Sequence, residues 1–166
     1  MKFYIKQKVF TLVDKFSIYD ENGNEAYWVE GDFFTIGKKL DLFDKENNHK
    51  AHIHQKVLSF LPRFFIQING VDVAEVVKHI SVFKQKLSVD GYNWEIEGNF
   101  LAYEYDIYHN GNTIATISKE WFTFGDAYSI DVADGVDPVS VICVVLIIDA
   151  IRAQANNNGL KFSFRL

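Results

Sequence analysis

The feature that most constrains the fold is an apolar run near the C-terminus, at residues 139–148, which contains one serine and no charged side chain. Asp137 and Pro138 precede the run, and they suit the cap and the first position of a helix. A helix that is apolar on every side must be buried on every side. The run is shorter than the roughly 20 residues that cross a bilayer, and Asp149 closes it. We therefore expect a central helix at about residues 137–153, enclosed by the remaining chain, and not a transmembrane protein.

The composition favours one domain that spans residues 1–166. Hydrophobic residues make up 48% of the chain and aromatic residues 16%, which is enough for a sizeable core. Aromatic and β-branched residues favour strands. The net charge of −5 argues against nucleic-acid binding, because a basic surface supplies most of the affinity in such proteins.

The single cysteine, Cys143, lies inside the apolar run, so no disulfide can form within the chain. A lone cysteine in such a run is typical of a buried and inert thiol in a reducing compartment. Residues 1–8 alternate charged and apolar side chains, without the apolar stretch and cleavage site of a signal peptide. We therefore expect a cytoplasmic protein.

Upstream of the helix, short alternating segments separated by turn signals predict an antiparallel meander. Asn-Gly pairs at 22–23, 69–70 and 110–111 indicate tight hairpins. The predicted strands are 3–7, 16–19, 26–29, 33–36, 39–43, 51–58, 63–68, 73–77, 80–83, 86–89, 94–97, 103–108, 114–118, 121–124 and 128–132. After the helix, the Asn-rich residues 156–159 predict its end. The alternation at 160–166 predicts a final half-buried strand.

Many short strands need closure to hide their edges, and the apolar helix needs complete cover. A closed antiparallel barrel with the C-terminal helix through its centre meets both demands. In such a barrel, each strand points alternate side chains at the helix.

Two stretches resemble the LURP-one-related family, and the small bacterial members most of all. Residues 16–31 read Phe-Ser-Ile-Tyr-Asp-Glu-Asn-Gly-Asn-Glu-Ala-Tyr-Trp-Val-Glu-Gly, and Ile-Glu-Gly-Asn-Phe at 96–100 is later matched with Ser-Lys-Glu-Trp-Phe at 118–122. The resemblance covers essentially the whole chain. The family is similar in fold to the Tubby C-terminal domain and to phospholipid scramblases, so the resemblance implies a mainly β (α+β) fold, with twelve strands around a buried hydrophobic helix. It implies the fold far more strongly than a function.

A local likeness to the scramblases raises calcium binding as an alternative. Residues 126–132, Asp-Ala-Tyr-Ser-Ile-Asp-Val, resemble the acidic segment before the scramblase helix, and the weak calcium candidates are Asp126, Asp131 and Asp134. The sequence lacks a dense loop of alternating carboxylates, and Asp134 is also explained by a turn. We expect neither a metal nor a cofactor.

Two further clusters have structural explanations. His52 and His54, with His49 just before them, are the most metal-like group, but zinc needs a third and usually a fourth ligand. We therefore expect a solvated strand face. Asp149 and Arg152 lie three residues apart on the predicted helix, where they can pair as it leaves the core.

Lysines supply the most specific functional expectation. Lys2, Lys6 and Lys8 would share one face of a regular N-terminal strand, where they could hold anionic lipid headgroups, as the Tubby likeness implies. Other lysines are spread over strand faces and turns, and they include Lys38, Lys39, Lys84 and Lys86.

The sequence contains no nucleophile elbow, phosphate-binding glycine loop, Cys-X-X-Cys pair or dinucleotide fingerprint. The leading hypothesis is therefore a non-enzymatic cytoplasmic barrel that binds an anionic phospholipid or phosphoinositide headgroup, or a membrane surface. The alternative is a scaffold or regulatory protein with a protein partner. A calcium-dependent lipid-moving protein ranks lower, because exposing the central helix would cost about 25 cal/mol per Å² of apolar surface.

Overall fold

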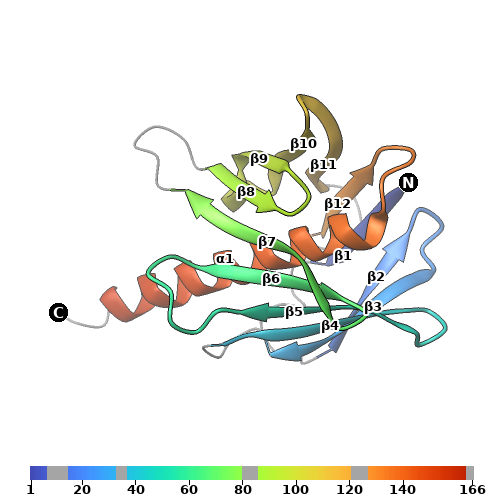
Figure 1. The fold of residues 1–166 in the computed structure, drawn as a ribbon. Coiled ribbons are helices and arrows are strands. Elements are labelled where there is room, and N and C mark those ends of the chain that lie inside the picture. Colours follow the sequence, from blue (N-terminus) through green and yellow to red (C-terminus); the bar gives the residue numbers. More distant parts are fainter. Residues whose placement is uncertain (7–14, 33–36, 80–85, 121–126, 164–166) are drawn as a thin grey trace.

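The computed structural model describes residues 1–6, 15–32, 37–79, 86–120 and 127–163. These residues form twelve strands, one short 3₁₀ helix and one long α-helix (Figure 1). The strands are β1 (Lys2–Lys6), β2 (Lys15–Asp20), β3 (Glu25–Asp32), β4 (Lys39–Asp44), β5 (His49–Gln55), β6 (Arg63–Ile68), β7 (Val71–His79), β8 (Lys86–Asp90), β9 (Trp94–Asn99), β10 (Glu104–His109), β11 (Asn112–Glu120) and β12 (Ala127–Val132). The helices are η2 (Phe100–Ala102) and α1 (Pro138–Ser163).

The sheet is a closed antiparallel barrel, which confirms the predicted architecture. Each strand pairs with its neighbours in the chain, and β1 closes the ring by pairing with β12, where Phe3 lies opposite Ile130. Side chains alternate as the meander predicts. On β1, Phe3 and Ile5 are buried against the helix, whereas Tyr4 lies on the outer face.

Asn-Gly turns set the register of the hairpins. Asn69 and Gly70 both have positive φ angles, 52° and 78°, and Asn110 and Gly111 have 50° and 78°. Two consecutive positive φ angles are the mark of a type I′ turn, whose twist matches that of the flanking strands. The sequence signal for these hairpins is therefore confirmed.

Helix α1 enters the barrel through a cap and runs along its interior (Figure 1). The Asp137 carboxylate accepts hydrogen bonds from the backbone N–H groups of Val139 (3.2 Å) and Ser140 (3.0 Å). Every residue from 141 to 148 is buried, including Cys143. By length and composition, the window Pro138–Ala155 is sufficient for a membrane span, but 67% of it is buried inside this structure.

The predicted C-terminal strand is wrong. The helix does not end at 156–159 but continues to Ser163, and residues 160–163 are helical. The closed ring gives the physical reason: β1 and β12 already pair with each other, so none of the described strands offers a free edge. Residues 164–166 and the strands predicted at 33–36, 80–83 and 121–124 lie outside the described residues.

Antiparallel order gives the barrel two distinct ends. The entry end, where α1 begins, carries the connections 21–24, 45–48, 69–70, 91–93, 110–111 and 133–137. The exit end, where α1 leaves, carries the described connections 37–38, 56–62 and 100–103. In Figure 1 the entry end lies on the right and the exit end on the left.

Candidate functional site

The outer face of β1 is the surface that the sequence singled out. Lys2 and Lys6 do share this face, and each ammonium lies over an aromatic ring, at 5.4 Å from the Tyr4 centroid and 5.6 Å from the Tyr19 centroid. Lys2 also pairs with Glu120 at 3.1 Å, and this hydrogen bond raises the pKa of Lys2. Lys8 lies outside the described residues. Lipid binding by these lysines stays a prediction.

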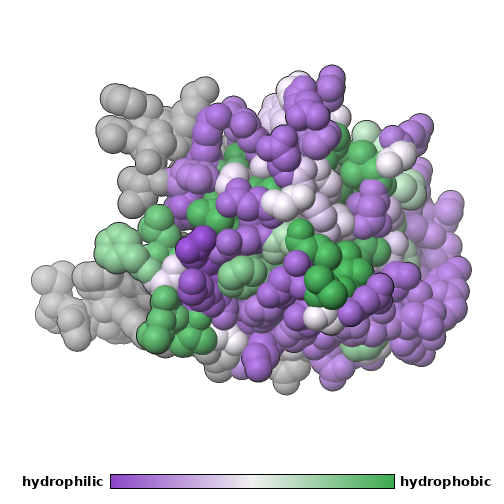
Figure 2. Space-filling view, in the orientation of Figure 1, coloured by the Kyte–Doolittle hydropathy of each residue, from purple (hydrophilic) through white to green (hydrophobic). Residues whose placement is uncertain are grey.

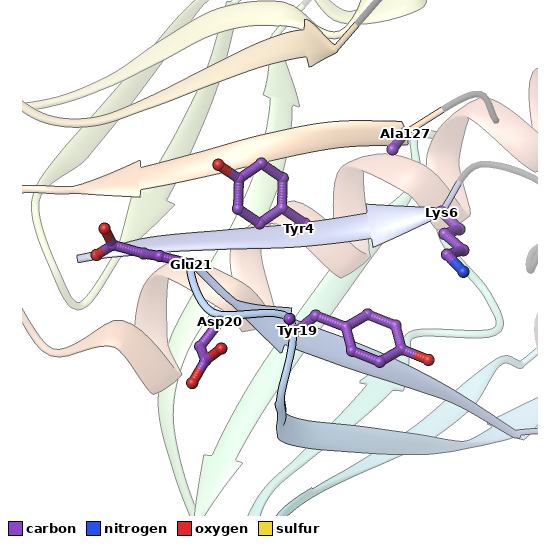
Figure 3. Close-up of a pocket in the computed structure, with 7 residues that line it drawn as sticks. Tyr4, Lys6, Tyr19, Asp20, Glu21 and Ala127 are labelled. Carbon is purple, nitrogen blue, oxygen red and sulfur yellow. The ribbon is translucent and has the colours of Figure 1, made fainter. Parts of the chain in front are cut away.

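A groove of about 400 Å³ lies beside β1 (Figure 3). Its lining includes Tyr4 and Lys6 from β1, Tyr19 from β2, and Asp20 and Glu21 at the hairpin. Asp20 is engaged in the turn through the backbone N–H groups at positions 22 and 24, and these bonds keep the pKa of Asp20 low. The groove thus offers one amine beside two carboxyl groups, which suits a polyanionic headgroup poorly.

The calcium candidates do not come together. Asp131, at the end of β12, and Asp134, in the turn before α1, are both exposed, and Asp126 lies outside the described residues. Within the described ranges, no three His, Cys, Asp or Glu side chains are placed to hold a metal ion.

The histidines lie on strand faces and contact carboxylates. His49 Nε2 and His52 Nδ1 lie 2.7 Å and 2.8 Å from the same Oδ1 atom of Asp41. His54 shares the face of His52, as predicted, and its ring stacks on Phe65 at a centroid distance of 5.2 Å. Asp41 thus gives His49 and His52 one polar partner each, and Phe65 packs against His54.

A buried polar cluster joins α1 to the wall of the barrel. The Tyr128 hydroxyl donates a hydrogen bond to Asp149, and Arg152 pairs with Asp149 at 3.3 Å, which confirms the predicted helix pair. Arg152 also donates to the Leu101 carbonyl (3.0 Å) and lies over the Tyr103 ring. Burial raises the pKa of Asp149 to about 7, although Tyr128 and Arg152 act to lower it. The cluster fixes the helix to η2.

Large apolar side chains are exposed at the exit end. In the connection between β5 and β6, Val57 is 60% exposed, Leu58 92% and Phe60 97%. Leu101 of η2 is also exposed. Figure 2 shows apolar side chains at the left of the molecule, where Figure 1 places the β5–β6 connection. Exposed single apolar residues are ordinary, whereas several neighbouring ones on one connection make it a candidate interaction surface.

Sequence reasoning missed this surface. It extended a strand over residues 51–58, whereas β5 ends at Gln55 and leaves Val57 and Leu58 in the connection. A signal was present, because the consecutive apolar pairs at 57–58 and 60–61, followed by Pro62, break the alternation of a half-buried strand.

Charge separates between the two ends of the barrel. Each end consists of its described connections and, from each described strand, the two residues nearest to that end. At the exit end, Lys38 aside, eight residues are cationic: Lys6, Lys15, Lys39, Lys56, Arg63, Lys78, Lys86 and Lys119. Three described residues there are acidic: Asp32, Glu104 and Glu120. At the entry end, eleven described residues are acidic: Asp20, Glu21, Glu25, Asp44, Glu46, Asp72, Asp90, Glu95, Asp131, Asp134 and Asp137. The described lysines there are Lys2, Lys45 and Lys50.

Some of the exit-end cations are already engaged. Arg63 pairs with Glu75 at 2.6 Å, and Lys15 lies 3.6 Å from the centre of the Trp28 ring. Lys39 and Lys56 are exposed and have no acidic partner among the described residues. These two amines are therefore the best placed for an anionic ligand.

Lys38 departs from the sequence expectation. The sequence places Lys38 among the lysines of strand faces and turns, but it is 1% exposed, and its ammonium has no hydrogen-bond partner within the described part of the chain. Burial lowers the pKa of Lys38, while Asp32 acts to raise it. A buried amine of this kind adds little to the outer field.

Three comparisons with known proteins agree with the fold. A family model described as LURP-one-related matches residues 1–149. The Bacillus subtilis (strain 168) protein YxjI is 34% identical over 151 residues, covering 91% of this chain and 93% of that protein. An Arabidopsis thaliana protein solved by X-ray crystallography superposes with a TM-score of 0.66 at 17% identity, covering 91% of this chain and 90% of that one. At that identity, the likeness establishes the fold alone.

Proposed function

Since the chain belongs to the LURP-one-related family, we propose that it is a non-enzymatic barrel protein that binds anionic membrane surfaces through its exit end. The observation that carries this proposal is the separation of charge, with cations in excess at the exit end and acids in excess at the entry end. Each lysine or arginine near an anionic membrane contributes about 1 kcal/mol.

The net charge of −5 does not oppose this orientation. The six residues of a strand such as β10 span about 20 Å, whereas charges are screened over about 8 Å at physiological ionic strength. An anionic surface at the exit end is therefore largely shielded from the acidic entry end. The field also orients the approaching protein, because the entry end is repelled.

The non-enzymatic part of the proposal is supported by how the polar groups are used. His49 and His52 contact Asp41, and Asp149 is held by Tyr128 and Arg152. Cys143 is buried, and burial raises the pKa of its thiol. Each of these groups thus has a structural explanation.

Liposome flotation tests the proposal. The purified protein is mixed with neutral, phosphatidylserine-containing and phosphoinositide-containing vesicles at two salt concentrations. We expect binding to the anionic vesicles that weakens with salt. The double variant Lys39→Glu/Lys56→Glu should lose it, and the matched entry-end variant Lys45→Glu/Lys50→Glu should keep it. An absence of binding to every anionic vesicle at low salt would overturn the proposal.

The β1 face is tested in the same assay. If Lys2→Glu/Lys6→Glu abolishes flotation while Lys39→Glu/Lys56→Glu does not, the lysines of β1 and not those of the exit end bind the lipid. In the proposed orientation, Lys6 adds to the exit-end field and Lys2 does not, because Lys2 begins β1 at the entry end. Lys6→Glu alone should therefore weaken binding more than Lys2→Glu alone.

A further inference from the structure

We propose that the β5–β6 connection is a hydrophobic membrane anchor, whose tip enters the headgroup–acyl boundary of an anionic bilayer. The inference rests on the proposed function. It adds which side chains insert into the bilayer, which the distribution of charge does not specify. The anchor consists of Val57, Leu58 and Phe60.

The first argument is exposure. Leu58 and Phe60 keep almost their whole side chains in water, and Val57 keeps more than half. Packing in the described structure therefore does not explain why these three positions are apolar. A partner that removes these side chains from water would explain their apolar character, because burial of apolar surface is favourable.

The second argument is that the base of the connection is held firmly. The Lys56 N–H donates to the Arg63 carbonyl at 2.9 Å, which closes the connection, and the Gln55 N–H donates to the Lys38 carbonyl at 2.9 Å. The amides of Gln55 and Gln154 approach each other at 3.4 Å and join the base to α1. A tip on a fixed base loses little conformational freedom on binding.

The third argument identifies the occupant as a bilayer. The exposed Lys56 directly precedes the apolar tip, and the exposed Lys39 begins β4, which pairs with β5. An apolar tip with two exposed amines at its base matches a bilayer, in which the acyl chains lie beneath the anionic headgroups. The tip also projects from the surface, and a bilayer can receive a projecting tip without a matching groove.

Leu101 gives the anchor a second contact at the same end. Its backbone carbonyl accepts a hydrogen bond from Arg152 (3.0 Å), while the β5 side of the mouth is joined to Gln154. The β5–β6 connection and η2 are thus both hydrogen-bonded to residues 152–154 of α1, where the helix leaves the barrel. The helix sets their positions relative to each other.

Uncharged substitutions separate the anchor from the electrostatic attraction. Leu58→Ser/Phe60→Ser removes apolar surface and leaves every charge in place, so its vesicle affinity should fall at least tenfold at both salt concentrations. The matched control is Val71→Ser, an apolar residue 62% exposed at the entry end. That variant should bind like the wild type. Thermal melting of both variants should be nearly unchanged, because Leu58, Phe60 and Val71 are all largely exposed.

An environment-sensitive fluorophore reports insertion directly. Cys143 is buried, so a cysteine introduced by Phe60→Cys can be labelled selectively, with Val71→Cys as the control site. The label at position 60 should shift to the blue on anionic vesicles, and the label at position 71 should not. Equal emission at both sites, with unchanged affinity of Leu58→Ser/Phe60→Ser, would overturn the anchor.

The two proposals fail in distinguishable ways. If the wild type binds no anionic vesicle, the proposed function fails and the anchor fails with it. If it binds and the Ser variant binds equally well, only the anchor fails. Loss of a stoichiometric protein complex in the Ser variant, with vesicle binding unchanged, would overturn the anchor and assign the tip to a protein partner.

Discussion

At the entry end of the barrel, the strands are joined by short turns of Asn, Gly and Asp, whereas at the exit end the described connections expose Val, Leu and Phe. The entry-end turns satisfy their own backbone: Asp20 and Asp44 each accept N–H groups from the residues that follow them. In the exit-end connection 56–62, the backbone is hydrogen-bonded where the connection begins, through the Lys56 N–H and the Arg63 carbonyl. Its large apolar side chains at 57, 58 and 60 stay in water. The comparison separates turns whose side chains bind their own backbone from a connection whose apolar side chains stay in water.

The sequence shows the same contrast. The segments that follow even-numbered strands contain two large apolar or aromatic residues in all, Tyr92 and Val136. Each segment that follows an odd-numbered strand contains at least three large apolar or aromatic residues. These segments are 7–14, 33–38, 56–62, 80–85, 100–103 and 121–126. Turn formation alone does not require this composition.

The largest effect should come from the helix that links the two ends. Val145→Asp places a charge where the side chain is fully buried in the apolar core. Both ends should lose their structure, and soluble expression should be abolished. Val71→Asp, at an exposed site of the entry end, should express and melt normally. A soluble Val145→Asp protein with a wild-type melting curve would contradict the central role of α1.

Two glycines, one at each end, should differ in their tolerance of a methyl group. A Cβ at Gly98 would lie 2.5 Å from the Glu104 carbonyl oxygen and 2.6 Å from the Tyr105 Cα, with φ at +141°. Gly98→Ala should therefore destabilise the protein by about 3 kcal/mol or more. At Gly111 a Cβ would meet nothing within 4 Å, and φ is +78°, so Gly111→Ala should cost only the roughly 1–2 kcal/mol of a left-handed backbone. Urea unfolding of both variants measures the difference, and equal midpoints would contradict it.

Asp149, the buried aspartate of the helix, should make the stability of the protein depend on pH. Burial raises the folded-state pKa of Asp149 to about 7, from 3.8. Between these values, the folded protein holds a proton that the unfolded chain has released. The Asp149 contribution to stability is therefore complete below about pH 4 and is lost as pH rises through about 7.

The Asp149→Asn variant tests this dependence. An amide cannot ionise, so the variant should lose the fall in unfolding free energy between about pH 4 and 7, which is on the order of a few kcal/mol. Denaturant unfolding at several pH values in this range measures it. Parallel pH profiles of variant and wild type would show that Asp149 keeps an ordinary pKa.

The smallest effect should come from the cap at the entry end. Asp137→Ala removes the acceptor for the backbone N–H groups of Val139 and Ser140. It should lower stability by about 1 kcal/mol, or about 2–4 °C in melting temperature for a chain of this size. Asp134→Ala, at an exposed position of the same turn, is the control and should melt like the wild type. A larger loss for Asp134→Ala would contradict the capping role of Asp137.

Much of the fold follows from the sequence because its causes are local. The apolar helix, the alternating strands and the Asn-Gly hairpins at 69–70 and 110–111 are all confirmed. Each depends on residues within one element, whose periodicity or turn chemistry is legible without knowing the neighbours. The demand that an apolar helix be wrapped then selects a closed barrel.

The rest depends on which elements meet. The sequence places Lys38 among lysines of strand faces and turns, but the structure buries it. The sequence predicts a strand at 160–166, but residues 160–163 are helical. Lys2 pairs with Glu120, which lies on a strand far along the chain. The exit-end surface was missed because the order of the strands decides which connections share an end. The sequence by itself determined the elements and the need for closure, since both arise from local patterns and from burial. Only the tertiary structure decided the separation of charge and the projecting apolar tip, because pairing between distant strands brings these residues to one end.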